Sequence, residues 1–121
     1  MPERRGKTIL IVEDEFLVSA MVSIELEDVG YDVLTADNGD AALAYLAGDW
    51  PIDLLFTDIK LAGGMDGWAV AQKARELRPD LKVIYATGYT PDVPELVTGA
   101  RFFKKPYLPT KIVAAIDEML G

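Results

Sequence analysis

Three carboxylates of this chain stand directly after apolar segments. Asp58 follows the run 54–57, and Glu13 with Asp14 follows the aliphatic run 8–12. Runs of this kind indicate strands that are buried on both faces of a parallel sheet. Because the carboxyl ends of parallel strands share one edge, and neighbouring strands lie about 4.8 Å apart, Asp14 and Asp58 can reach a single ion. Without a counterion the three carboxylates would repel one another.

A cation at this edge must be one that prefers oxygen ligands. The chain contains no histidine and no cysteine, so the usual nitrogen and sulfur ligands of a metal are missing. Few carboxylates together with water are the ligands that Mg²⁺ and Mn²⁺ take in proteins. The sequence therefore predicts Mg²⁺, with Mn²⁺ as an alternative.

Two further polar side chains follow later apolar runs. Thr87 ends the run 82–86, and Lys105 comes directly after the run 101–104. A metal ion and a lysine can neutralise the oxygens of a phosphoryl group during its transfer. We therefore expect Asp58 to act as a nucleophile that forms an aspartyl phosphate, with Thr87 and Lys105 beside it.

The elements that position these residues alternate along the chain. Expected strands cover 8–12, 31–35, 53–58, 82–86 and 101–104, and expected helices cover 16–29, 41–47, 68–78 and 109–120. This alternation is typical of an α/β fold with a doubly wound, five-stranded parallel sheet and helices on both faces. The run 31–35 is shorter and less apolar than 8–12, which suits an edge strand and gives the order 2-1-3-4-5.

The connection between the fourth and fifth strands departs from this rhythm. Residues 88–100 must supply two loops and a helix, yet they contain Pro91 and Pro94. Because proline interrupts helical hydrogen bonding, we expect a fourth helix that is short or irregular.

Length and charge limit the remaining possibilities. The 121 residues suit one domain, 1–121, in which 1–7 form a flexible tail. The net charge of −8 argues against nucleic-acid binding, and no apolar stretch is long enough for membrane insertion. Without a signal peptide we expect a cytoplasmic protein. No output domain fits in this length, so we expect output by protein contact.

Taken together, these segments resemble the receiver domain of two-component response regulators, of the CheY-like, single-domain type. The resemblance covers about 7–120 and rests on four motifs. They are Ile9-Leu10-Ile11-Val12-Glu13-Asp14-Glu15, Asp58 with Met65-Asp66-Gly67 after it, Ala86-Thr87-Gly88, and Lys105-Pro106-Tyr107. The resemblance implies a flavodoxin-like fold and a phosphoacceptor switch in a phosphorelay.

The resemblance also implies roles around the metal. Asp58 would be the phosphoacceptor and Asp14 a direct Mg²⁺ ligand, while Glu13 would act largely through water. The backbone carbonyl of Lys60 would complete the ligands that the protein supplies.

A second group of roles concerns the phosphoryl group and the switch. Thr87 and Lys105 would bind phosphoryl oxygens, and the peptide bond from Lys105 to Pro106 would be cis. Phe102 would rotate when Thr87 moves, although it lacks the hydroxyl often found there. Lys60 and Tyr89, each two residues beyond a site residue, would control the access of water to the phosphoryl group.

Two departures from the family pattern stand out. The loop after Asp58 is one residue longer than is common, with Ala62 where proline is frequent. The stretch 85–89, Tyr-Ala-Thr-Gly-Tyr, resembles a receiver subgroup with a Phe/Tyr-Ala-Thr-Gly motif and a reduced fourth helix.

The partners that follow are a sensor histidine kinase or a histidine phosphotransfer protein, and a downstream protein that the sequence does not name. Val18 and Met21 on the first helix are the expected apolar docking contacts. The chain would catalyse only its own phosphorylation and dephosphorylation. Two alternatives stay open, an interaction module that works without phosphorylation and a Mg²⁺-dependent phosphatase. A phosphatase of that kind usually has a second aspartate two residues after the nucleophile, where this chain has Lys60.

Overall fold

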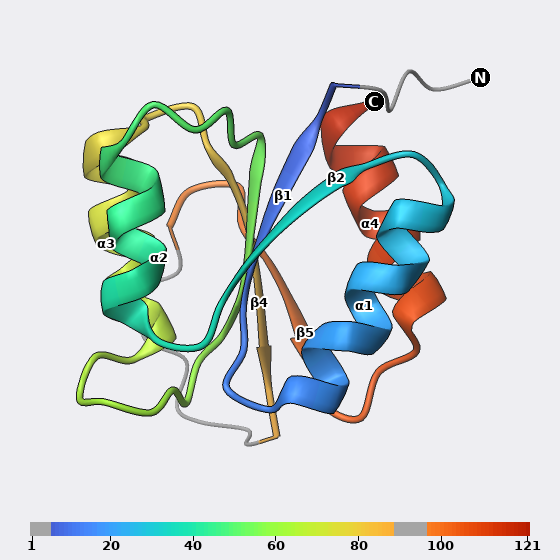
Figure 1. The fold of residues 1–121 in the computed structure, drawn as a ribbon, viewed down its shortest axis with the longest axis horizontal. Coiled ribbons are helices and arrows are strands. Elements are labelled where there is room, and N and C mark those ends of the chain that lie inside the picture. The colour runs from blue at the N-terminus through green and yellow to red at the C-terminus, as the bar shows by residue number, and fades with distance from the viewer. Residues whose placement is uncertain (1–5, 89–96) are drawn as a thin grey trace.

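The computed structural model describes residues 6–88 and 97–121, and it contains one parallel sheet between two layers of helices (Figure 1). The strands are β1 (Thr8–Val12), β2 (Asp32–Ala36), β3 (Leu54–Asp58), β4 (Lys82–Thr87) and β5 (Arg101–Lys104). The helices are α1 (Phe16–Asp28), α2 (Gly39–Ala47), α3 (Gly67–Leu77) and α4 (Pro109–Leu120). The strand order is β2-β1-β3-β4-β5, as the sequence predicts.

Strand burial follows from position in the sheet. All five residues of β1 and all five of β3 are buried, because helices cover both faces of these strands. β2 and β5 carry exposed residues at intervals, which is the pattern of strands at the two edges. The prediction that 31–35 forms an edge strand is therefore confirmed.

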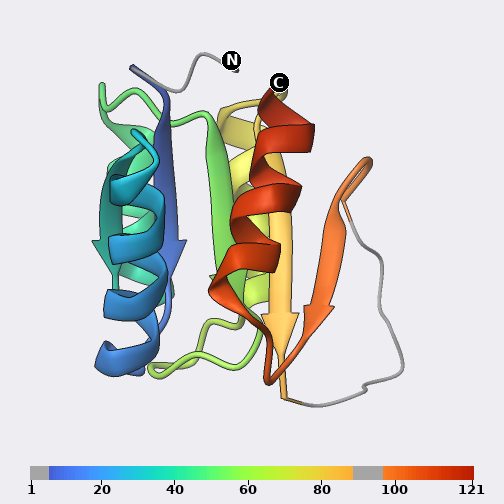
Figure 2. The same cartoon turned by 90° about the vertical axis from the view of Figure 1, so that its right-hand side faces the viewer.

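The helices divide the core into two halves. α2 and α3 cover one face of the sheet, and α1 and α4 cover the other (Figures 1 and 2). Alternate strand residues enter each half, so that Leu10 and Leu55 pack toward α2 and α3 while Ile9 and Leu54 pack toward α1 and α4. None of the helices within the described residues is long and apolar enough to cross a membrane.

Side-chain caps explain where two helices begin. Asn38 Oδ1 accepts a hydrogen bond from the Ala41 amide at the start of α2, at 2.8 Å. Asp66 Oδ1 accepts one from the Ala69 amide at the start of α3, at 2.9 Å. Each side-chain oxygen accepts from an amide that has no partner inside the helix. Although the loop after β3 is one residue longer than is common, the Asp66 cap therefore sets the start of α3 at Gly67.

Two predictions fall partly outside the described residues. The short or irregular helix that was expected between β4 and β5 lies mostly in 89–96, which the structure does not describe. The expected flexible tail 1–7 includes 1–5, which also lie outside. Its last residue, Lys7, is half-buried and donates a hydrogen bond from Nζ to the Leu120 carbonyl at 3.1 Å.

Gly67 lets α3 begin against the end of β3. Its amide donates to the Ile59 carbonyl at 2.7 Å, which brings its Cα against the backbone of Asp58. A Cβ at this position would collide with the Asp58 carbonyl oxygen and lie 2.8 Å from Ile59 Cα. Both atoms belong to the backbone of the strand end that presents Asp58.

Gly67→Ala should therefore destabilise the protein and disturb the strand end. We expect the free energy of unfolding to fall by about 1–3 kcal/mol, because backbone must move to accept the methyl group. Urea unfolding measures this change. Gly48→Ala is the matched control, since the atom nearest to a Cβ there, the Ala44 carbonyl oxygen, lies at an ordinary contact distance of 3.5 Å. An equal loss in both variants would contradict the explanation.

Candidate functional site

The predicted site residues meet at the carboxyl edge of the sheet. Strand register pairs Asp58 with Ala86 on β4, and Thr87 with Lys104 on β5. The Lys105 amide then donates to the Thr87 carbonyl at 2.7 Å, so that the end of β5 continues along β4. A pocket at this edge is lined by residues from four strand ends and the loop after β3. They are Asp14, Glu15, Asp58, Lys60, Leu61, Ala62, Thr87, Gly88 and Lys105.

The two carboxylate oxygens of Asp58 have different partners. Oδ1 accepts a hydrogen bond from the amide of Ile59 at 2.9 Å, and Oδ2 accepts one from Lys105 Nζ at 3.0 Å. The side chain is only 8% exposed, so these contacts rather than solvent set its orientation. One oxygen is therefore bound to a backbone amide and the other to the Lys105 ammonium group.

Lys105 holds two carboxylates at once. Its Nζ lies 2.8 Å from Glu13 Oε1 and 3.0 Å from Asp58 Oδ2, and it lies 4.0 Å from Glu15 Oε1. Glu13 and Asp58 are buried, so the two shorter contacts are shielded from water far better than a surface ion pair. The lysine partly balances the charge that the strand ends concentrate here.

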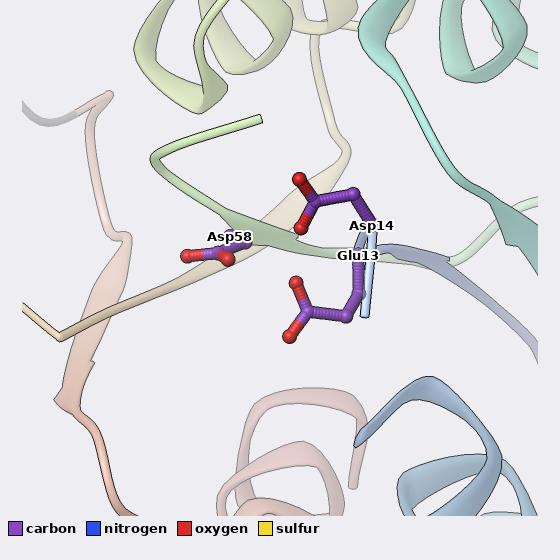
Figure 3. A group of neighbouring side chains, drawn as sticks. All are labelled: Glu13, Asp14 and Asp58. Carbon is purple, nitrogen blue, oxygen red and sulfur yellow. The ribbon is translucent and has the colours of Figure 1, made fainter. Parts of the chain in front are cut away.

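The acidic group has an unused ligand atom. Glu13, Asp14 and Asp58 each offer an oxygen, and these oxygens lie within 4.8 Å of one another (Figure 3). Asp14 is exposed, whereas Glu13 Oε2 is buried and has no hydrogen-bond partner within the described residues. A buried carboxylate oxygen without a donor is costly, and a cation would satisfy it. The donor set, all oxygen, fits a hard divalent ion.

The pKa values in the site follow from this crowding. Burial first, and then the neighbouring Asp58 carboxyl, raise the pKa of Glu13 from 4.5 to about 7. Burial alone would lower the pKa of Lys105, but hydrogen bonds to Glu13 and Asp58 outweigh it and raise that pKa above its ordinary value. Lys105 is thus a permanent cation, while Glu13 is the carboxyl that resists ionisation.

Thr87 and Lys60 both line the pocket, and their expected roles there stay predictions. Thr87 is 1% exposed yet contributes to the pocket lining, and Lys60 is exposed at its rim. The peptide bond between Lys105 and Pro106 is cis, which confirms the expectation from the resemblance.

The two remaining predictions have different outcomes. Phe102 is half-buried on β5 and packs against the core on the α2 and α3 side of the sheet. Its role in switching stays a prediction. Tyr89 lies outside the described residues, so its expected role also stays a prediction.

One site feature was not predicted from the sequence. A groove beside the pocket runs between α1 and the segment after β5, and Glu15 and Lys105 line both cavities. Tyr107 forms part of its wall and packs edge to face on Phe56, with 5.7 Å between the ring centroids. Burial, followed by the charge of Glu13, raises the pKa of Tyr107 to about 12. Its position after Lys105-Pro106 is the signal that could have identified it.

A family model, curated relatives and solved structures all match this chain to the same family. The family model described as "Response regulator receiver domain" matches residues 9–117. The response regulator receiver protein CpdR of Brucella abortus (strain 2308) is 35% identical over 119 residues, which cover 94% of this chain and 97% of that protein. The chain spans about half the length of other curated relatives, 52% of one and 49% of the next.

Solved structures give the same result. The CheY-like receiver domain protein from Methanospirillum hungatei JF-1 superposes with a TM-score of 0.87 at 35% identity, over 94% of this chain and 93% of that one. Response regulator TrrA from Thermotoga maritima, solved in complex with Mg(2+)-BeF, superposes with a TM-score of 0.80 at 30% identity. That match covers 94% of this chain and 99% of the other.

Proposed function

The chain belongs to the response regulator receiver domain family, and we propose that it accepts a phosphoryl group on Asp58 and signals through the resulting change in its surface. It is homologous to response regulators of two-component systems, whose receiver domains are signalling switches. The observation that carries the proposal is the Asp58 carboxylate, held by Lys105 at 3.0 Å in a pocket that Thr87 also lines. The narrower resemblance, to the subgroup with the Phe/Tyr-Ala-Thr-Gly motif, stays a prediction.

The transfer step uses the different partners of the Asp58 oxygens. Oδ2, the oxygen beside Lys105, attacks phosphorus of a donor phosphohistidine while Oδ1 stays on the Ile59 amide. A P–O bond forms and the P–N bond breaks, and the leaving imidazole nitrogen keeps the electron pair of that bond and takes up a proton. Lys105 then exchanges a carboxylate for a phosphoryl oxygen, and the Thr87 hydroxyl donates to another.

We propose that Mg²⁺, or Mn²⁺ in its place, is held by Glu13, Asp14 and Asp58 together with the Lys60 backbone carbonyl. When bound, the ion would neutralise charge on the phosphoryl oxygens. The proposal draws support from the clustered carboxylates, from Glu13 Oε2, which has no partner in the described part of the chain, and from the Mg(2+)-BeF complex of the related TrrA. We also propose that the chain catalyses only its own phosphorylation and the hydrolysis of the resulting aspartyl phosphate.

The proposed docking face for a histidine kinase or phosphotransfer protein is α1 with the adjoining groove. Phe16 and Leu17 are 80% and 74% exposed at the start of α1, and Met21 is 56% exposed one turn later. Val18 and Met21 line the groove that Lys105 shares with the phosphoryl pocket. A partner bound there would lie next to Asp58. We also propose a cytoplasmic location, one domain over residues 1–121 and a downstream partner that is a protein.

An interaction module that works without phosphorylation is the competing function. The comparisons give no support to the phosphatase alternative. The competing function shares the fold and the docking face, so only chemistry at Asp58 separates it from the proposal. Acetyl phosphate is a small donor that needs no docking face, so it tests the chemistry at Asp58 separately from partner binding.

Asp58→Asn should abolish phosphorylation. The wild-type protein should gain one phosphoryl group from acetyl phosphate with Mg²⁺, and the variant should gain none, because an amide is not a nucleophile for phosphorus. Intact-mass spectrometry measures the gain. Asp32→Asn is the control and should react like the wild type. Asp32 is an exposed acid at the amino-terminal end of β2, and the pocket lies at the carboxyl ends of the strands. A wild-type protein that takes phosphoryl neither from acetyl phosphate nor from any phosphorylated kinase would favour the competing function.

Mg²⁺ should raise the melting temperature, because it relieves repulsion among the carboxylates and binds only the folded chain. At a concentration about 100 times the dissociation constant, the stabilisation should be about 2.7 kcal/mol. Differential scanning fluorimetry measures the shift, with NaCl of equal ionic strength as control. Asp14→Asn should reduce the response. A melting temperature that does not respond to millimolar Mg²⁺ would refute the metal site.

The metal-free protein should lose stability as the pH rises. Between about pH 4.5 and about pH 7 the folded chain keeps a proton on Glu13 that the unfolded chain has released, so the free energy of unfolding falls across this window. Glu13→Gln should flatten this slope, because the amide does not titrate. Urea unfolding in a chelator, repeated across the window, measures both slopes. Equal slopes for the two proteins would show that another group is responsible.

A further inference from the structure

Tyr85 makes a contact that the proposed phosphoryl chemistry does not use. It is fully buried on β4, and its hydroxyl oxygen accepts a hydrogen bond from the Val97 amide at 3.3 Å. Burial raises the pKa of this hydroxyl above its usual range, so it stays neutral at physiological pH. Tyr85 and Thr87 are two residues apart on one strand, so their side chains point to the same face of the sheet.

A second contact holds the same turn from α3. Arg75 donates from Nη2 to the Thr98 carbonyl and from Nε to the Leu81 carbonyl, each at 2.7 Å. The turn 97–100, which leads into β5, is thus bound at Val97 by the strand that carries Thr87 and at Thr98 by helix α3. We call Arg75 and Tyr85, with the backbone groups of Val97 and Thr98 that they bind, the crossover anchor.

Aromatic packing joins the crossover anchor to its surroundings. The ring of Tyr85 lies 4.7 Å from that of Trp68 on α3, centroid to centroid. On its other side Tyr85 is the register partner of Phe102 on β5. Trp68, Val97 and Phe102 all pack against the same half of the core. A movement of β4 near Thr87 would therefore displace Tyr85, and through its contacts α3 and the start of β5.

Phe102 has no hydroxyl, so it cannot report a change at Thr87 by making or breaking a hydrogen bond. Its register partner Tyr85, which lies on the same strand as Thr87, does have a hydroxyl. That hydroxyl accepts a hydrogen bond from the backbone of the turn before β5. Resting on the proposed function, we propose that the crossover anchor is the switch connection of this chain. It transmits the phosphorylation state from Thr87 to the surface formed by α3 and residues 97–100, where a downstream protein would read it.

Amide exchange measured by NMR tests the resting contact. In the metal-free wild type the Val97 amide should exchange about threefold to tenfold more slowly than in Tyr85→Phe, the ratio that one neutral hydrogen bond accounts for. Tyr31→Phe is the matched control, because it removes a hydroxyl that binds Asp117 on the α1 and α4 side. Arg75→Gln repeats the test from α3 and should also speed exchange at Val97. Equal Val97 rates in the wild type and both test variants would overturn the crossover anchor.

The same spectra with Mg²⁺ and beryllofluoride test transmission. A shift of the Ile59 amide, which donates to Asp58, beyond the shift that Mg²⁺ alone causes reports that beryllofluoride has bound. In the wild type we expect that shift together with a change of at least about threefold in Val97 exchange, the scale of one hydrogen bond made or lost. In Tyr85→Phe we expect the Ile59 shift alone. An Ile59 shift without a Val97 change in the wild type would overturn the proposed connection. The absence of any Ile59 shift would instead overturn the proposed role of Asp58.

Discussion

The concentration of negative charge at one edge of the sheet is the constraint on which the rest of this structure depends. Parallel pairing of β1 with β3 brings oxygens of Glu13, Asp14 and Asp58 within 4.8 Å of one another, and two of these side chains are buried. Like charges at this distance destabilise the fold unless a cation offsets them. Lys105 supplies one such cation from the end of β5, and an oxygen-binding metal would supply another. The features that make the edge costly to fold are therefore the ones that suit it to hold a phosphoryl group.

The neighbouring backbone keeps this edge in place. The Asp58 carboxylate is oriented by the next amide in the chain, and the peptide that carries it packs against Gly67 at the start of α3. α3 in turn begins at a side-chain cap on Asp66, so the helix start and the strand end are aligned by short contacts. Lys105 is placed in the same manner, since its amide continues the pairing of β5 with Thr87. Geometry at the phosphoryl pocket thus depends on backbone groups as much as on the charged side chains.

The two sides of the sheet contribute differently to signalling. On the α1 side, apolar residues of the first helix are exposed next to the pocket, and the groove with Tyr107 in its wall shares Lys105 with it. On the α3 side, the buried ring of Tyr85 packs against the half-buried ring of Trp68, and two hydrogen bonds, from Arg75 and to Tyr85, hold the turn before β5. An open apolar surface suits a partner that must come and go beside Asp58. A packed, hydrogen-bonded row suits the transmission of a small movement, because close-packed side chains do not yield independently.

The sequence by itself determined the strand order, the edge position of β2, the helices and the meeting of Asp14, Asp58, Thr87 and Lys105 at one edge. It could do so because continuous apolar runs, helix caps and parallel strand direction are local patterns with one spatial consequence. Only the tertiary structure decided that Lys105 binds Glu13 and Asp58 together, that Glu13 Oε2 has no partner among residues 6–88 and 97–121, and that the Tyr85 hydroxyl reaches Val97. These contacts join residues that are far apart in the chain. Their distances depend on how helices and loops pack, which no spacing in the sequence encodes.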